Sequence, residues 1–191
     1  MRAHEIGVDP RPGLSLVQLA RGNVTAASAS LEDALKDEGL DPLARVPFLA
    51  AGVEIHYVRG DSEALRTVAT ELEETAQTFG TTALAAHAAY ARGTAEVASG
   101  NPAEASHSLK QAHQLWLEGE VPYEAARARE MLAETLLRSG QVDASTLELR
   151  AARSAFLNSV RTWMSSGLTV ASPRPSEPTC NPRFLLSATR A

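Results

Sequence analysis

The residues most able to do chemistry in this chain are its histidines, its single cysteine and a group of carboxylates near residue 70. The histidines are His4, His56, His87, His107 and His113. The closest two are six residues apart, which places them about 120° from each other on a helix. No His-Glu-x-x-His motif and no cysteine–histidine cluster accompanies them. We therefore expect no metal site, and histidines that are exposed or lightly packed.

The carboxylates of Glu71, Glu73 and Glu74 could in principle supply an acid–base pair. Residues this close in sequence point in different directions on a helix, so we expect them to form a solvated face. The serines lack a Gly-x-Ser-x-Gly elbow, and Cys180 lies far along the chain with no base near it in sequence. The sequence thus predicts no catalytic residue, no cofactor and no enzyme. An active site assembled from histidines and glutamates on the folded chain is the alternative.

Composition excludes several classes of protein. The 191-residue chain has a formal net charge of −5, whereas proteins that bind nucleic acid by neutralising phosphates are basic. One cysteine allows no intrachain disulfide, which favours a reducing compartment. No apolar run reaches the roughly 18 residues of a membrane span, and the first residues do not resemble a signal peptide. These features predict a soluble, cytoplasmic protein with no membrane contact.

The elements that must position any functional residue are indicated by a recurring glycine. A small residue or arginine, a glycine and then Asn, Asp or Gln recur at Gly22, Gly60, Gly100 and Gly140, which are 38, 40 and 40 residues apart. A second series falls between them at Gly39, Gly80 and Gly119. Amphipathic segments fill the intervals, and a fixed period of roughly 20–50 residues is the signature of a helical repeat array. We predict an all-α fold of about four antiparallel helix pairs.

The predicted boundaries follow from proline, glycine and capping residues. Residues 1–13 form an N-terminal segment with two prolines, residues 14–158 the helical repeat domain, and residues 159–191 a disordered tail rich in Pro, Ser and Arg. Asp41-Pro42, Asp61, Thr81-Thr82, Asn101-Pro102 and Pro122 are expected to begin helices. Pro47 is expected to kink its helix or to delay its start. Trp116 and Tyr123 flank a turn and are expected to fill a junction between repeats.

Positions counted from the repeat glycines predict where neighbouring helices crowd each other. Seven residues before each glycine, and five and twelve after it, the residues are mostly small. These positions are Ser15, Val53, Gly93 and Ala133; Ala27, Leu65, Ala105 and Ser145; and Ala34, Leu72, Ala112 and Ala152. The pattern is tetratricopeptide-like, with a period near 40 instead of the usual 34, and predicts a right-handed superhelix with longer helices.

Four phrases together resemble one family. They are Asp9-Pro-Arg-Pro-Gly-Leu14, Gln18-Leu-Ala-Arg-Gly22, Leu115-Trp116 and Pro122-Tyr-Glu-Ala-Ala-Arg-Ala-Arg129. Across residues 9–157 the chain resembles the repeat segment that precedes the DNA-binding domain in large LuxR-type (MalT-like) transcriptional regulators. In that family, the resemblance implies, an ATPase module precedes the repeats and a helix-turn-helix follows them.

The chain departs from that family at both flanks. Gly167-Leu168-Thr169 is similar to the family's helix-turn-helix opening, but Val-Ala-Ser-Pro follows and no recognition helix can be seen. No Gly-x-x-x-x-Gly-Lys-Ser/Thr phosphate loop is present either. We expect a truncated regulator fragment whose residues after about 157 are read out of frame. A cut array would expose an apolar end face and self-associate.

The surface with the best claim to function is the concave face, which the first helix of each pair lines in such arrays. Counting from the glycines places seven residues there: Glu54, Tyr57, Tyr90, Thr94, Arg127, Glu130 and Glu134. Tyrosine and arginine dominate binding hot spots, so this face suits a protein or peptide partner, whereas simple solvation of the array is the alternative. The resemblance also implies an inducer-sensing role, and with it a small-molecule ligand. The leading prediction is a non-enzymatic interaction module of a regulator; a free-standing adaptor and a DNA-binding regulator are the alternatives.

Overall fold

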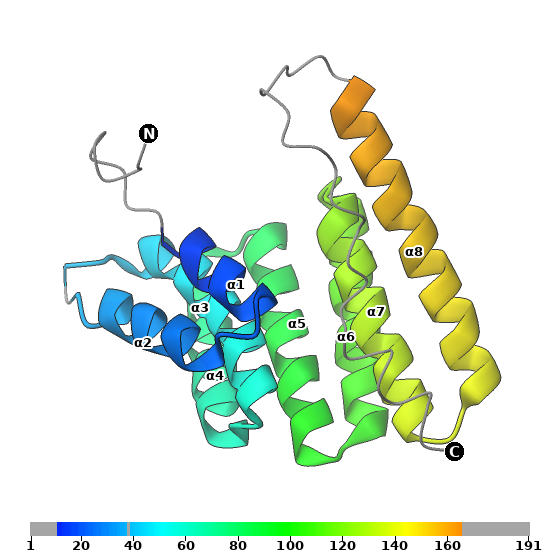
Figure 1. The fold of residues 1–191 in the computed structure, drawn as a ribbon, viewed down its shortest axis with the longest axis horizontal. Coiled ribbons are helices and arrows are strands. Elements are labelled where there is room, and N and C mark those ends of the chain that lie inside the picture. Colours follow the sequence, from blue (N-terminus) through cyan, green and yellow to red (C-terminus); the bar gives the residue numbers. More distant parts are fainter. Residues whose placement is uncertain (1–10, 38, 166–191) are drawn as a thin grey trace. The chain divides into compact units, whose positions relative to one another are not determined.

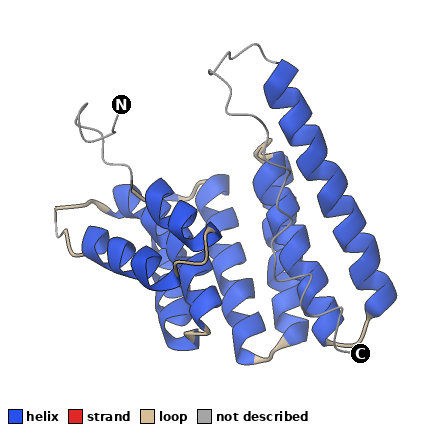
Figure 2. Ribbon diagram, viewed as in Figure 1, coloured by secondary structure: helices blue, strands red, loops and turns tan. Residues whose placement is uncertain are grey.

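The computed structural model describes residues 11–37 and 39–165, and within these ranges it confirms the all-α prediction. The described chain forms helices joined by short turns and contains no strand (Figure 2). The helices are α1 (Gly13–Ala20), α2 (Val24–Leu35), α3 (Pro42–Arg59), α4 (Ser62–Phe79), α5 (Thr82–Ser99), α6 (Pro102–Glu118), α7 (Pro122–Arg138) and α8 (Val142–Ser165) (Figure 1). The chain divides into two units, residues 1–159 and 160–191, and nearly all of the described residues belong to the first.

Helix starts agree with the predicted caps at three places. The side chains of Asp41, Asp61 and Thr81 accept hydrogen bonds from the backbone N–H groups three residues later, at 2.8, 3.0 and 3.3 Å. Prolines occupy the first helical position of α3, α6 and α7, where a missing N–H costs nothing. Asn101 differs from the prediction, because its side chain makes no capping hydrogen bond.

Helix ends repeat one turn geometry. At Gly100 φ is +79°, and the N–H of Asn101 donates to the carbonyl of Glu96 at 2.9 Å, which closes the last turn of α5. The same six-residue closure follows Gln18, His56 and Leu136. The turn after α6 differs from the expectation, since Gly119 has φ −80° and Glu120 takes the left-handed position with φ +56°.

Two predicted boundaries need correction. Helix α3 begins at Pro42 and contains Pro47, so the second proline does not delay the start of the helix. Helix α8 runs to Ser165, so residues 159–165, which the sequence analysis assigned to the tail, are helical. The rest of the tail, like the first ten residues of the N-terminal segment, lies outside the described residues.

The helices of the first unit form two layers, one of odd-numbered and one of even-numbered helices, and the two layers differ in how closely their helices pack. From α1 to α7 each helix packs against the next in the chain. The odd-numbered helices also contact one another in sequence, α1 with α3, α3 with α5 and α5 with α7, whereas α2, α4 and α6 have no such contacts with one another. The layer of odd-numbered helices is therefore the more tightly packed, as expected for the first helix of each pair in a repeat array.

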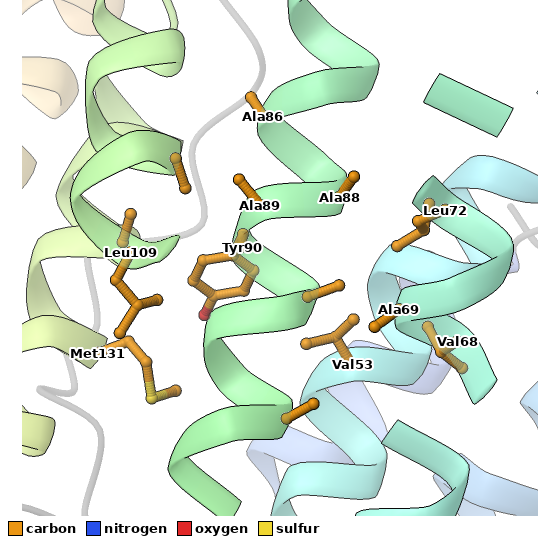
Figure 3. Close-up of a cluster of buried hydrophobic side chains, with 14 of the residues drawn as sticks. Val53, Val68, Ala69, Leu72, Ala86, Ala88, Ala89, Tyr90, Leu109 and Met131 are labelled. Carbon is orange, nitrogen blue, oxygen red and sulfur yellow. The ribbon is translucent and has the colours of Figure 1, made fainter. Parts of the chain in front are cut away.

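The positions predicted to crowd are buried. Eleven of them are at most 4% exposed: Ser15, Ala27, Ala34, Val53, Leu65, Leu72, Ala105, Ala112, Ala133, Ser145 and Ala152. Gly93, the twelfth, is also buried. Figure 3 shows this close packing around α5, whose small alanine side chains allow α4 on one side and α6 on the other to come close. Some large apolar side chains of the helices are not covered, since Leu43, Phe79 and Leu147 are 45%, 42% and 65% exposed.

Gly93 is expected to tolerate no side chain. A Cβ built there would lie 2.7 Å from Cγ of Leu109 and 3.2 Å from the backbone nitrogen of the same residue. Alanine is the better helix former by about 1 kcal/mol, but overpacking of this kind costs about 1–3 kcal/mol. The difference between these two effects predicts that Gly93→Ala lowers the free energy of unfolding, measured in urea, by up to about 2 kcal/mol.

Gly52 provides the matched control for this substitution. It is also a buried glycine in an odd-numbered helix, but its Cβ would meet nothing closer than 3.4 Å, at Cδ2 of Leu31. Gly52→Ala is expected to raise the free energy of unfolding by roughly 0.5–1 kcal/mol through helix propensity. Equal effects of the two substitutions would contradict the close approach of α5 and α6.

Candidate functional site

All seven residues predicted for the concave face lie on odd-numbered helices, and six of them contribute to one surface. Glu54 and Tyr57 are on α3, Tyr90 on α5, and Arg127, Glu130 and Glu134 on α7. Together with Glu124 and Arg138 of α7, we call them the A-helix surface. All of these residues except Arg138 are half-buried or buried. They form two groups, centred on Glu54 and Tyr57 of the same helix, α3.

The first group centres on Glu54. Its Oε1 accepts a hydrogen bond from the hydroxyl of Tyr90 at 2.9 Å and forms an ion pair with Arg127. The guanidinium of Arg127 also pairs with Glu124 at 2.7 Å and lies 5.4 Å from the centre of the Tyr90 ring. Three helices, α3, α5 and α7, therefore meet through charged hydrogen bonds and a cation–π contact.

The second group centres on Tyr57. Its hydroxyl donates to Oε1 of Glu134 at 2.6 Å and accepts a hydrogen bond from Arg138 at 2.9 Å. Arg138 also donates to Glu134 at 2.6 Å, one helical turn away, and lies 5.8 Å from the Tyr57 ring centre. The two groups use the same chemistry, a tyrosine with a carboxylate on its hydroxyl and an arginine against its ring.

The electrostatics fix the protonation states of the first group. Burial, and then the negative charge of Glu54, raise the pKa of Tyr90 far above its ordinary value, so its hydroxyl remains a donor. Burial opposes the charge of Arg127, but Tyr90, Glu54 and Glu124 outweigh this effect and raise its pKa. Burial, and then Glu54, raise the pKa of Glu130, which has no ion-pair partner among the described residues.

One predicted residue does not belong to this surface, and two members were missed. Thr94 is fully buried, and its hydroxyl donates to the backbone carbonyl of Tyr90 at 2.9 Å, so it cannot meet a ligand. Glu124 and Arg138 were not predicted. They stand three residues before Arg127 and four after Glu134, and these helical spacings with opposite charges could have identified both.

His87 and His113 are packed more closely than predicted, whereas His107 is exposed, as predicted. His87 contacts the buried Trp116 edge to face, with ring centres 4.7 Å apart, and His113 Nδ1 lies 3.0 Å from the carbonyl of Ala125. Trp116 is thus buried between α5 and α6, the two helices of one pair, whereas it was expected at a junction between repeats. Tyr123 is 53% exposed and touches Phe156 of α8, with ring centres 5.3 Å apart.

The carboxylates near residue 70 do not form the solvated face that was predicted. Glu71 forms an ion pair with Arg45 of α3 at 2.5 Å, and Glu73 with Arg92 of α5 at 3.2 Å, and both glutamates are half-buried. Glu74 is exposed beside a shallow hollow on α4. The pairing explains why the two glutamates are two residues apart: they point to different neighbouring helices.

The described residues offer no metal site. No three histidine, cysteine or acidic side chains of the described chain are grouped closely enough to hold a metal ion. His4 and Cys180 lie outside the described residues.

Two further findings concern the chain as a whole. Of the helices that the structure describes, none has the length and apolar character to cross a membrane. Comparisons with protein-family models, with curated proteins and with solved structures found no match to this chain.

Proposed function

We propose that this chain is a non-enzymatic interaction module that binds a segment of a protein through the A-helix surface. The observation that carries the proposal is the gathering of Tyr57, Arg127 and Arg138 from two helices on one surface, with Tyr90 of α5 buried against Arg127. Such residues supply most of the binding energy of protein interfaces. The neighbouring odd-numbered helices hold them in place without loops, which limits the entropy lost when a partner binds.

The charges of the surface favour a basic partner. Four carboxylates, those of Glu54, Glu124, Glu130 and Glu134, face two arginines, which leaves an excess of two negative charges if all are ionised. A lysine or arginine of the partner would relieve the repulsion that contributes to the raised pKa of Glu130. We therefore expect the bound segment to carry basic residues.

The wider setting of the module is part of the same proposal. The phrases between residues 9 and 129 support a place among the repeat segments of LuxR-type transcriptional regulators, in the cytoplasm. In such a regulator the module would bind a protein partner, a second regulator or an inducer, and DNA contact would belong to another domain.

Selection of peptides from a displayed random library on the purified chain tests the binding function. We expect enriched peptides to contain lysine or arginine, and to bind Tyr57→Ala and Arg138→Ala variants at least tenfold more weakly than the native chain. Arg66→Ala on the outer surface of α4 is the matched control and should bind as the native chain does. Enriched peptides that bind all variants equally would exclude the A-helix surface. Salt-sensitive binding to duplex DNA would instead favour a DNA-binding regulator.

A further inference from the structure

We propose that the side chains joining α3 to α7 act as a clasp that sets the distance between these two helices and holds the A-helix surface in a closed form. The clasp consists of Glu54 and Tyr57 on α3 and of Arg127, Glu134 and Arg138 on α7. It does not depend on the proposed binding function, because it concerns the free chain.

The clasp is unexpected in a repeat array. In such arrays each repeat contacts its neighbours, and the bend between repeats follows from those contacts alone. Here the backbones of α3 and α7 each approach that of α5 but do not approach each other. The long side chains of α3 nevertheless reach α7: Glu54 pairs with Arg127, and Tyr57 bonds Glu134 at 2.6 Å and Arg138 at 2.9 Å.

Two features make this connection able to fix a distance. The contacts occur at two levels along α3, because Glu54 and Tyr57 are one helical turn apart, and a tie at two levels resists rotation as well as separation. They are also partly shielded from water. Side-chain exposure is 24% for Arg127, 25% for Glu54 and 21% for Glu134, so salt screens these charges less than charges on an open surface.

The clasp also explains how the surface is kept closed. The hydroxyl of Tyr57 and the carboxylates of Glu54 and Glu134, the groups a partner would use, already bind groups of the chain itself. If Glu54 and Tyr57 did not bind α7, the angle between α3 and α7 would depend only on the packing of each helix against α5. The two helices could then move apart. We infer that the free chain exists as a closed form from which α3 and α7 can open.

Distances between spin labels at positions 63 and 141 test the clasp. Glu63 opens α4 directly after α3, and Gln141 follows α7; both are exposed and lie outside the clasp. Each labelled protein carries Glu63→Cys, Gln141→Cys and Cys180→Ser. In this background, Glu54→Met with Tyr57→Phe removes the ion pair of Glu54 with Arg127 and the hydrogen bonds of Tyr57 with Glu134 and Arg138, and it keeps side chains of similar size. We expect pulsed electron resonance to show a longer and wider distance distribution than in the chain with an intact clasp.

Glu73→Met is the matched control, because it removes an ion pair of similar exposure between the adjacent helices α4 and α5. Its distance distribution should equal that of the intact chain. Helix content by circular dichroism must be the same in all three proteins, which separates opening from unfolding. A distance distribution in the clasp variant equal to that of the intact chain would overturn the proposal. An equal widening in the clasp variant and in the Glu73→Met control would overturn it as well. Neither result requires a partner, so failure of the clasp and failure of peptide binding can be told apart.

Discussion

Leu109→Ala is expected to lower the free energy of unfolding by about 2–5 kcal/mol, the range observed when a buried leucine is truncated. Leu109 is fully buried and lies on the side of α6 that faces α5 (Figure 3). It packs on Gly93, where no side chain can move in to fill the space. Small domains are typically stable by about 5–15 kcal/mol, so this change should remove a large share of the total, measured by urea unfolding.

Leu147→Ala is the matched control for Leu109→Ala. Leu147 is also a leucine of an even-numbered helix but is 65% exposed, so we expect a change of no more than about 0.5 kcal/mol. The combination of Leu109→Ala with Gly93→Ala should cost less than the sum of the two single changes, because the added methyl group enters the space that the leucine leaves. Equal costs for Leu109→Ala and Leu147→Ala would contradict the packing of α6 on α5.

The helices and much of their packing could be predicted because the relevant signals are local. Proline and aspartate begin helices at Pro42 and Asp61, and glycine ends them at Gly60 and Gly100, wherever the rest of the chain lies. A constant distance from these glycines then marks one face of each helix. Residues such as Ala105 and Ala133 are buried for this reason.

What the local pattern does not contain is whether another helix covers a given face. Leu43 fits the apolar stripe of α3 as well as Leu65 fits that of α4, but Leu43 is 45% exposed whereas Leu65 is fully buried. The start of the C-terminal tail was misplaced for a related reason. Residues 159–165 continue a helix that is already formed, and propagation of a helix costs far less than its initiation.

The candidate site shows the same division. The register of α3, α5 and α7 placed Glu54, Tyr90 and Arg127 on one surface correctly. Which side chains of this surface bind each other could not be predicted. The hydrogen bond from Tyr57 to Glu134, for example, spans 77 residues and depends on the distance between two helices that do not follow each other in the chain. Only pairs within one helix, such as Glu134 with Arg138, were accessible from the sequence.

His87 is expected to make the fold sensitive to mild acid. Burial, and then the positive charge of Arg127, lower the pKa of His87 to about 4 from an ordinary value of 6.5. The unfolded chain therefore binds a proton at a higher pH than the folded chain does. The free energy of unfolding should fall as the pH drops from about 6.5 to about 4, by about 3 kcal/mol at most, since one pKa unit corresponds to about 1.4 kcal/mol.

Replacing His87 by phenylalanine isolates this effect from the titration of carboxylates in the same range. A phenyl ring keeps the edge-to-face contact with Trp116 but cannot be protonated. Urea unfolding of the native chain and of His87→Phe at several pH values should give curves that diverge below pH 6.5, with the native chain losing more stability. His107→Phe, which changes an exposed histidine on α6, is the matched control and should follow the native curve. Parallel curves for the native chain and His87→Phe would mean that the imidazole is as accessible to protons in the folded chain as in the unfolded one, and would contradict its burial between α5 and α6.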